Sequence, residues 1–197
     1  MDLDSDLKYI EPSSDQGRVR MLEGKKVNLR VIDTEDISIY AEWMNDRAFL
    51  GEFFIPRQRA HSDYEKGFKE RSPDSEKFII ETKDGTKAGW ITFFLSRFGG
   101  GATSTEIGYA LAPEHRGKGY CTEAVTIMLD YLFLLQKIER IQALIADENV
   151  ASKRVLEKTG FEREGVLRKL AYSIGKWWNV TVYSILREEW KEPKILK

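Results

Sequence analysis

The stretch Ala112–Ala124 holds the residues of this chain that are best suited to binding a charged ligand. Two glycines, Gly117 and Gly119, alternate with two basic residues, and an amphipathic, helix-forming segment follows them directly. Glycines let the backbone curl so that several N–H groups point at one spot, and a helix N-terminus adds partial positive charge there. The stretch therefore predicts a binding site for a phosphate or pyrophosphate group.

The spacing of the glycines excludes two common nucleotide-binding patterns. A P-loop needs four residues between its glycines and a Ser or Thr after Gly-Lys, whereas a single residue separates Gly117 from Gly119. The dinucleotide-binding pattern G-x-G-x-x-G would need a third glycine where this chain has Thr122. Neither a P-loop nor a Rossmann site is therefore expected.

The segment LAPEHRGKGYCTEA resembles the acetyl-CoA loop of the GNAT N-acetyltransferases, with motif (Q/R)-x-x-G-x-(G/A). Gly117 and Gly119 match its glycines, and Glu114 replaces its usual first residue. EIGYAL resembles the family's central strand, and ADENVASKRVLEKTGFEREG its second cofactor segment. Near the two ends, VNLRVIDTEDISIYAEWMND and WWNVTVYSILREEW resemble the branch that acetylates the N-termini of ribosomal proteins. The resemblance covers about residues 21–190.

The resemblance implies a transferase that uses acetyl-CoA, without a metal, to acetylate a primary amine by direct attack in a ternary complex. It also implies an α/β fold of the GNAT type, in which helices cover both faces of a twisted mixed sheet. The acceptor stays open between a protein N-terminal α-amine and a small molecule such as a polyamine, an amino acid or an antibiotic. A non-catalytic acyl-CoA binding module is an alternative of another class. The acidic residues that would suit a polyamine at the pocket mouth are Glu42, Asp46 and Glu52.

The resemblance further assigns cofactor-binding positions. The central strand would hold the thioester carbonyl, the glycine loop the pyrophosphate, and the second cofactor segment the pantetheine arm. These positions are Tyr109, Ala110, Leu111, Arg116, Gly117, Lys118, Gly119, Tyr120, Cys121, Thr122, Asn149 and Ser152. Asn149 and Ser152 equally suit the capped first turn of a helix.

Glu106 and Ser152 are the candidates for catalysis. Ser152 matches a serine that, in the ribosomal branch, is thought to bond to the cofactor sulfur. Glu106, or water that it orders, is the candidate general base, although pairing with a lysine across the sheet would also explain a carboxylate there. The glutamate favoured as base in the ribosomal branch is matched here by Ala171. An α-amine has an ordinary pKa of about 7.7–8.0, whereas a lysine amine has one of about 10.4. An α-amine is therefore partly neutral at pH 7 and needs less help from a general base. The lack of a glutamate at Ala171 thus favours an α-amine acceptor.

Two further features have both a structural and a functional interpretation. Cys121 is expected near a helix N-terminus, which lowers the pKa of a thiol, but packing explains it more simply than an acetyl-cysteine intermediate. Trp177 and Trp178 are neighbours in a predicted strand and must point to opposite faces. One of them is therefore a candidate wall of the acceptor pocket or a dimer contact.

Length, charge and cysteine content limit the domain organisation, the binding partners and the compartment of the protein. With 197 residues, the chain is expected to form one domain over 21–197 after a flexible arm, 1–20. A net charge of −1 gives no general attraction to nucleic acid or to an anionic membrane. A single cysteine suits a reducing compartment, so we expect a cytoplasmic protein. The sequence leaves a homodimer open.

The hydrophobic pattern predicts the elements that would position these residues. Strands are expected at 26–32, 77–83, 87–96, 103–111, 140–146, 161–172 and 176–187. Helices are expected after Asp33, from His61 to about Arg71, at 122–135 and at 150–159. Asp84-Gly85 is a strong hairpin signal. The strand at 140–146 is expected parallel to 103–111, in a βαβ unit.

Overall fold

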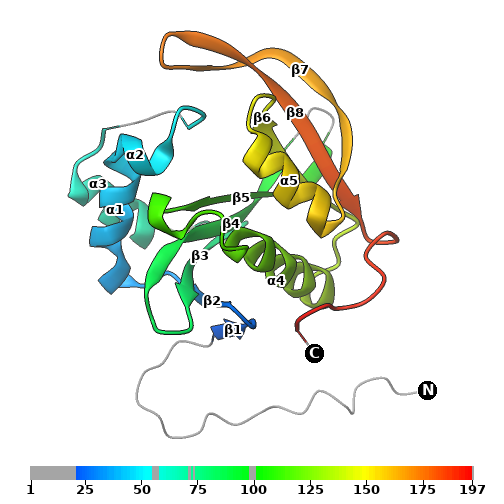
Figure 1. The fold of residues 1–197 in the computed structure, drawn as a ribbon, viewed down its shortest axis with the longest axis horizontal. Coiled ribbons are helices and arrows are strands. Elements are labelled where there is room, and N and C mark those ends of the chain that lie inside the picture. The colour runs from blue at the N-terminus through cyan, green and yellow to red at the C-terminus, as the bar shows by residue number, and fades with distance from the viewer. Residues whose placement is uncertain (1–20, 55–57, 71, 73, 98–100, 197) are drawn as a thin grey trace, which may run out of the picture.

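The computed structural model describes residues 21–54, 58–70, 72, 74–97 and 101–196; the expected arm, 1–20, lies outside them. Within these residues the chain forms one mixed sheet of eight strands with helices on both faces, which confirms the predicted α/β fold (Figure 1). The strands are β1 (Met21–Glu23), β2 (Val27–Val31), β3 (Ser75–Thr82), β4 (Lys87–Arg97), β5 (Thr103–Leu111), β6 (Arg140–Ala146), β7 (Glu162–Ser173) and β8 (Lys176–Leu186). The helices are α1 (Ile37–Asn45), α2 (Arg47–Leu50), α3 (His61–Lys69), α4 (Tyr120–Leu135) and α5 (Val150–Thr159).

The sheet has the order β1-β2-β3-β4-β5-β6-β8-β7. Strands β1 to β5 form an antiparallel meander, in which the predicted Asp84-Gly85 turn joins β3 to β4. Helix α4 then carries the chain to β6, which lies parallel to β5 as expected. Strand β8 pairs antiparallel with β6, and β7 pairs with β8, so β7 is an edge strand.

Side chains alternate between the two faces of β5, and each face has its own core. Ile107 and Leu111 pack with residues of α4 and α5 in the larger core. Ala110 packs in a second core with Trp90 of β4 and Trp43 of α1. Helices α4 and α5 therefore cover one face of the sheet, and α1, α2 and α3 lie on the other (Figure 1).

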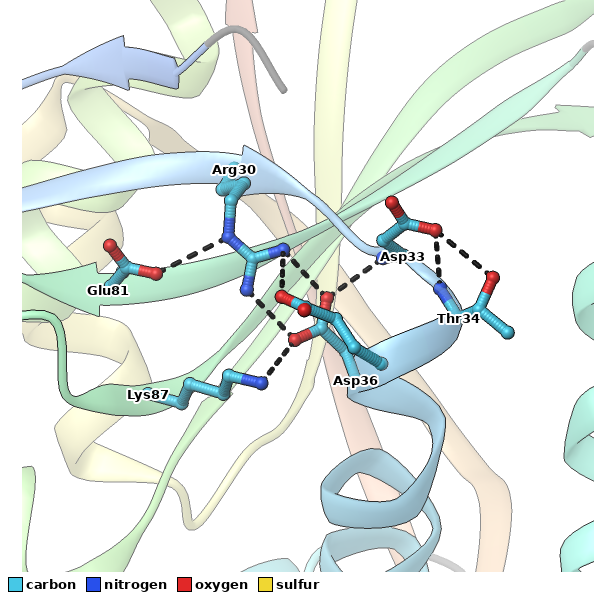
Figure 2. A network of polar contacts seen from close by, with 7 residues as sticks. Arg30, Asp33, Thr34, Asp36, Glu81 and Lys87 are labelled. Carbon is cyan, nitrogen blue, oxygen red and sulfur yellow. Dashed lines mark hydrogen bonds and ion pairs between the residues drawn. The ribbon is translucent and has the colours of Figure 1, made fainter. Parts of the chain in front are cut away.

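A buried ion-pair network fixes the start of α1 against the sheet (Figure 2). Asp36 is fully buried, accepts two hydrogen bonds of 2.8 Å from Arg30, and lies 2.6 Å from Nζ of Lys87. Burial by itself would raise the pKa of Asp36, but the hydrogen bonds from Arg30, Lys87 and the Asp33 N–H hold that pKa below its usual value. The network therefore locks α1 to both β2 and β4.

Two short elements, β1 and α2, are absent from the sequence-based prediction. Helix α2 spans four residues and begins after Asp46, whose side chain accepts hydrogen bonds from the N–H groups of Ala48 and Phe49. Helix α4 begins at Tyr120, two residues before its predicted start at Thr122. Elements of three or four residues are too short to show a hydrophobic period, so the pattern could not reveal them.

Candidate functional site

The glycine loop turns the backbone into the first turn of α4. Gly117 and Gly119 have φ angles of 76° and 82°, in the left-handed region that favours glycine, and Gly119 is the N-cap of α4. In the part of the chain that the structure describes, no N–H group of residues 117–122 donates to an acceptor. Six adjacent N–H groups without acceptors at a helix N-terminus are suited to bind an anion, so this geometry agrees with the cradle expected from the sequence, whose ligand stays a prediction.

Glu123, which the sequence analysis missed, holds this cradle against β1 and β2. Its carboxylate accepts hydrogen bonds of 2.8, 2.6 and 3.0 Å from the N–H groups of Lys25, Lys26 and Val27. Nζ of Lys26 in turn donates to the carbonyl of Lys118 at 3.2 Å. An acidic residue in the first turn of a helix suits the dipole, and that was the only signal of its position in the sequence.

Strand β5 separates from β6 beside the cradle. Only Thr105 and Glu106 of β5 pair with β6, so residues 107–111 have no partner on that side. Ala112 N donates to Ala88 O at 2.9 Å, and backbone groups alternate along a strand. The backbone N–H and C=O groups of Ala110 are therefore directed toward β4. The same groups of Tyr109 and Leu111 are directed toward the gap.

Gly89 makes the close approach of β4 to β5 possible at this point. A Cβ atom on Gly89 would lie 2.1 Å from the carbonyl oxygen of Ala110 and 2.9 Å from Cα of Leu111. The approach coincides with a register shift after Ile80, where β3 and β4 pair irregularly. A glycine at this position therefore shapes the strand that borders the gap.

The first turn of α5 lies across the gap from the cradle. Oδ1 of Asn149 accepts a hydrogen bond of 3.1 Å from Ser152 N, so Asn149 is the N-cap. The hydroxyl of Tyr109 donates to the carbonyl of Ser152 at 3.4 Å, and burial raises the pKa of that hydroxyl. The structure thus brings Tyr109, Asn149 and Ser152 together, although they come from two separate segments.

Glu106 lies on the other face of β5, where the strand still pairs with β6. Its Oε2 accepts hydrogen bonds of 2.9 Å from Ser96 Oγ and 3.1 Å from Gln142 Nε2. The partners of Glu106 are therefore a serine and an amide on the two neighbouring strands, and not the lysine considered from the sequence.

A cavity of about 760 Å³ opens on the face of the sheet that carries α1 and α3. Its walls are mainly aromatic and aliphatic, with charged residues among them. The residues that line it are Ile32, Ile37, Tyr40, Met44, Phe53, Phe54, Arg59, Asp63, Tyr64, Gly67, Phe68, Glu70, Ser72, Ser75, Glu76, Lys77, Thr92 and Ala171. Ala171 therefore faces this cavity, and it brings no carboxylate there.

The acidic residues that line the cavity differ from those expected for a polyamine acceptor. Asp63, Glu70 and Glu76 line it, whereas Glu42, Asp46 and Glu52 do not. The two tryptophans divide as predicted. Trp178 is buried, with its ring centroid 5.3 Å from that of Phe53, a cavity residue. Trp177 is 53% exposed on the opposite face of the hairpin.

Two predicted cofactor residues have side chains with other roles. The guanidinium of Arg116 donates to the carbonyls of Leu111, Ala48 and Phe49 at 3.0, 3.3 and 2.7 Å, and so ties α2 to the end of β5. Burial raises the pKa of the Cys121 thiol to about 12, opposite to the lowering expected from the helix N-terminus. Cys121 packs against the larger core as a neutral thiol, which favours the packing interpretation.

Comparison with known proteins identifies the family. Residues 26–162, more than half of the chain, match the sequence profile of an acetyltransferase (GNAT) domain. The chain belongs to the GNAT family. It is 31% identical over 169 residues to the uncharacterized N-acetyltransferase YnaD of Bacillus subtilis, and the match covers 84% of this chain and 96% of YnaD. With its homologues named as N-acetyltransferases, this GNAT protein is an N-acetyltransferase.

Two solved structures share the fold of this GNAT enzyme. The spermidine N-acetyltransferase of Vibrio cholerae, in complex with CoA and spermine, superposes with a TM-score of 0.76 at 22% identity, over 85% of this chain and 99% of that one. RimL, a ribosomal α-N-protein acetyltransferase in complex with CoA, superposes with a TM-score of 0.75 at 17% identity. The match covers 85% of this chain and 98% of RimL. Both relatives bind CoA, and the unpartnered N–H groups of residues 117–122 fit its pyrophosphate.

Two other kinds of feature are not found among the described residues. No helix there is long and apolar enough to cross a membrane. No group of three or more His, Cys, Asp or Glu side chains there is arranged to hold a metal ion.

Proposed function

We propose that this N-acetyltransferase takes acetyl-CoA as donor and acetylates a primary amine that enters the cavity, by direct attack in a ternary complex. One observation carries the proposal: a single stretch of β5 borders both sites. The gap and the cradle adjoin residues 107–111, and Thr92, the β4 partner of Gly108, lines the cavity on the other face. Donor and acceptor would therefore meet across this stretch.

The residues around the gap have distinct roles in the proposal. Acetyl-CoA supplies an acyl carbon activated as a thioester. The N–H groups of residues 117–122 hold the pyrophosphate. The N–H groups of Tyr109 and Leu111 point into the gap, where they would stabilise negative charge on a carbonyl oxygen. The side chains of Asn149 and Ser152 would hold the pantetheine arm and the departing sulfur.

Proton removal from the amine is assigned to Glu106, acting through water. Glu106 does not line the cavity, but its side chain shares the cavity face of β5 with Gly108. Because Ala171 offers no carboxylate, a substrate that is partly neutral at pH 7 suits the site. The α-amine of a protein N-terminus meets this requirement, so it is the favoured acceptor.

A small cationic amine is the second candidate acceptor. Asp63 and Glu70 at the cavity would attract it, and the aromatic walls would pack against its methylene groups. The relative from Vibrio cholerae whose structure contains spermine is named as a spermidine N-acetyltransferase. Free-thiol release from acetyl-CoA, measured with N-terminal peptides, polyamines and amino acids, decides between the two classes.

A substitution in the glycine loop tests the cradle. Gly117→Glu places a carboxylate among the N–H groups, and we expect the KM for acetyl-CoA to rise at least tenfold. Gly85→Glu is the matched control, because Gly85 has a similar φ of 85° and similarly open surroundings but lies in the β3–β4 turn. Equal KM values for the two variants would contradict the cradle assignment.

A further inference from the structure

The β7–β8 hairpin ends in a strained tip. Lys169 and Ile174 have φ angles of 54° and 51°, and among the described residues they are the only non-glycine residues with positive φ. Ile174 forms the turn with Gly175, at φ 72°, where Asn-Gly is the usual pair. A β-branched residue is rare in this conformation, and such outliers cluster at functional sites.

The same hairpin exposes large apolar side chains on both of its faces. Leu167 pairs with Val180 and so shares the face of Trp178, whereas Tyr172 and Trp177 lie on the opposite face. Five of the eight exposed large hydrophobic residues in the described chain lie on it: Leu167, Leu170, Tyr172, Ile174 and Trp177. The rings of Tyr172 and Trp177, which are cross-strand partners, have centroids 5.2 Å apart. Ile174 is thus both strained and 44% exposed, although neither property helps a turn to fold. Concentrated apolar exposure of this kind marks an interaction surface.

Beyond Glu164, the charged residues of the hairpin are all basic. Between Glu164 and Glu188 the chain has no acidic residue, and the hairpin end carries Arg168, Lys169 and Lys176. Glu164 itself is paired with Arg140. Lys169, Gly175, Lys176 and Trp177 line a hollow of about 490 Å³.

This surface adjoins the acceptor cavity. Strand β7 is the edge of the sheet, and the hairpin reaches beyond the other strands (Figure 1). Ala171 lines the cavity, while its neighbours Leu170 and Tyr172 are exposed. Nζ of Lys176 lies 3.8 Å from the ring centroid of Trp178, on the cavity side of the hairpin. An extended segment crossing the edge of β7 would therefore pass from the exposed surface to the cavity.

We propose that the hairpin tip, residues 167–177, docks an acidic segment of the protein whose N-terminal α-amine is acetylated. The proposal rests on the proposed function and names the class of its acceptor. Leu167, Leu170 and Ile174 suit apolar side chains of a polypeptide, whereas a nucleic acid would need more cations than the three at the tip. The positive charge of the tip selects an acidic polypeptide and disfavours a second copy of this equally basic surface.

Two matched peptide acceptors test the proposal. Both begin with the same four residues, and one continues with an acidic, leucine-containing tail while the other has a Ser/Gly tail. We expect the acidic tail to lower the acceptor KM at least tenfold with little change in kcat, and added salt to reduce the difference. In Lys169→Glu/Lys176→Glu, and separately in Trp177→Ser, the difference should fall below threefold.

The matched control is Lys137→Glu, a charge reversal of an exposed lysine before β6, at the end of β8 opposite to the tip. It should keep the full preference for the acidic tail. Equal KM values for the two tails in the parent protein would overturn the docking proposal while leaving acetyl transfer intact.

A direct binding measurement separates failure of docking from failure of the proposed function. Fluorescence anisotropy with the labelled acidic peptide should show binding that Lys169→Glu/Lys176→Glu weakens at least tenfold, whether or not any acceptor turns over. Absence of turnover with every acceptor would contradict the proposed function alone. Binding of an RNA oligomer in preference to the peptide would overturn the docking proposal. So would a dimer that Trp177→Ser converts to a monomer, if the acidic and Ser/Gly tails gave the same KM.

Discussion

Glu106 is the residue on which the proposed proton transfer depends. Glu106→Gln keeps the shape of the side chain but removes its basicity, so we expect kcat to fall about 100-fold with an unchanged KM for acetyl-CoA. Thiol release at saturating acetyl-CoA measures this. Ser96→Ala, which removes one hydrogen bond to Glu106 and leaves the carboxylate, should retain kcat within a few-fold. If both variants kept the parent rate, Glu106 would be only a link between β4 and β6.

Single residues around the gap also show which local expectations hold. Asn149 caps α5, as the sequence indicated, whereas Gly119 caps α4 two residues before the start predicted for that helix. Cys121 differs, because burial of the sulfur raises the pKa of the thiol more than the nearby charge of Arg116 lowers it. The assigned contacts of these residues with acetyl-CoA stay predictions that the Gly117→Glu experiment begins to test.

At the scale of elements, the paired strands β4 and β5 set the geometry of the gap. Gly89→Ala would force a Cβ atom against the Ala110 carbonyl, so β5 must move at the point where it borders the gap. We expect a loss of about 1–3 kcal/mol in the free energy of unfolding, together with a lower kcat. Urea denaturation and thiol release measure the two effects.

Gly165→Ala is the matched control for the strand substitution. Gly165 lies in β7, and a Cβ atom there would meet nothing within 4 Å. This variant should keep both stability and kcat near those of the parent. A Gly89→Ala protein with normal kcat would show that the acyl group does not depend on the position of β5.

At the scale of the whole molecule, the Asp36 network joins α1 to the sheet (Figure 2). Asp36→Asn would leave Arg30, which is 9% exposed, without its bidentate partner, and we expect a loss of about 3–5 kcal/mol in the free energy of unfolding at pH 7. Asp33→Asn is the control, because its exposed side chain caps the same turn and asparagine caps equally well. Urea denaturation compares the three proteins.

The same network predicts a pH dependence of stability. The pKa of Asp36 is lower in the folded protein than its ordinary value of about 3.9 in an unfolded chain. Its ionised form therefore contributes stability above that value, and the contribution is lost as the pH falls through the folded pKa. The difference in the free energy of unfolding between the parent and Asp36→Asn should have its full size at pH 7 and become smaller below about pH 4. A constant difference down to pH 2 would contradict this.

The sequence by itself determined the features that depend on neighbouring residues. The glycine loop, the N-cap of α5, the Asp84-Gly85 turn and the alternation of Trp177 with Trp178 follow from backbone preferences and periodicity within a few residues. The βαβ unit also followed, because the hand and spacing of a crossover restrict where the next parallel strand lies.

Only the tertiary structure decided the contacts between segments far apart in the chain. Glu123 binds the turn before β2, Arg116 binds the carbonyls after Asp46, and Ala171 faces the cavity beside α1 and α3. Such contacts depend on where whole elements pack, and nothing in the spacing of residues specifies that. Burial has the same origin, because solvent is excluded by distant segments. Burial by distant segments raises the pKa of Cys121, whereas the side chains at the hairpin tip stay exposed.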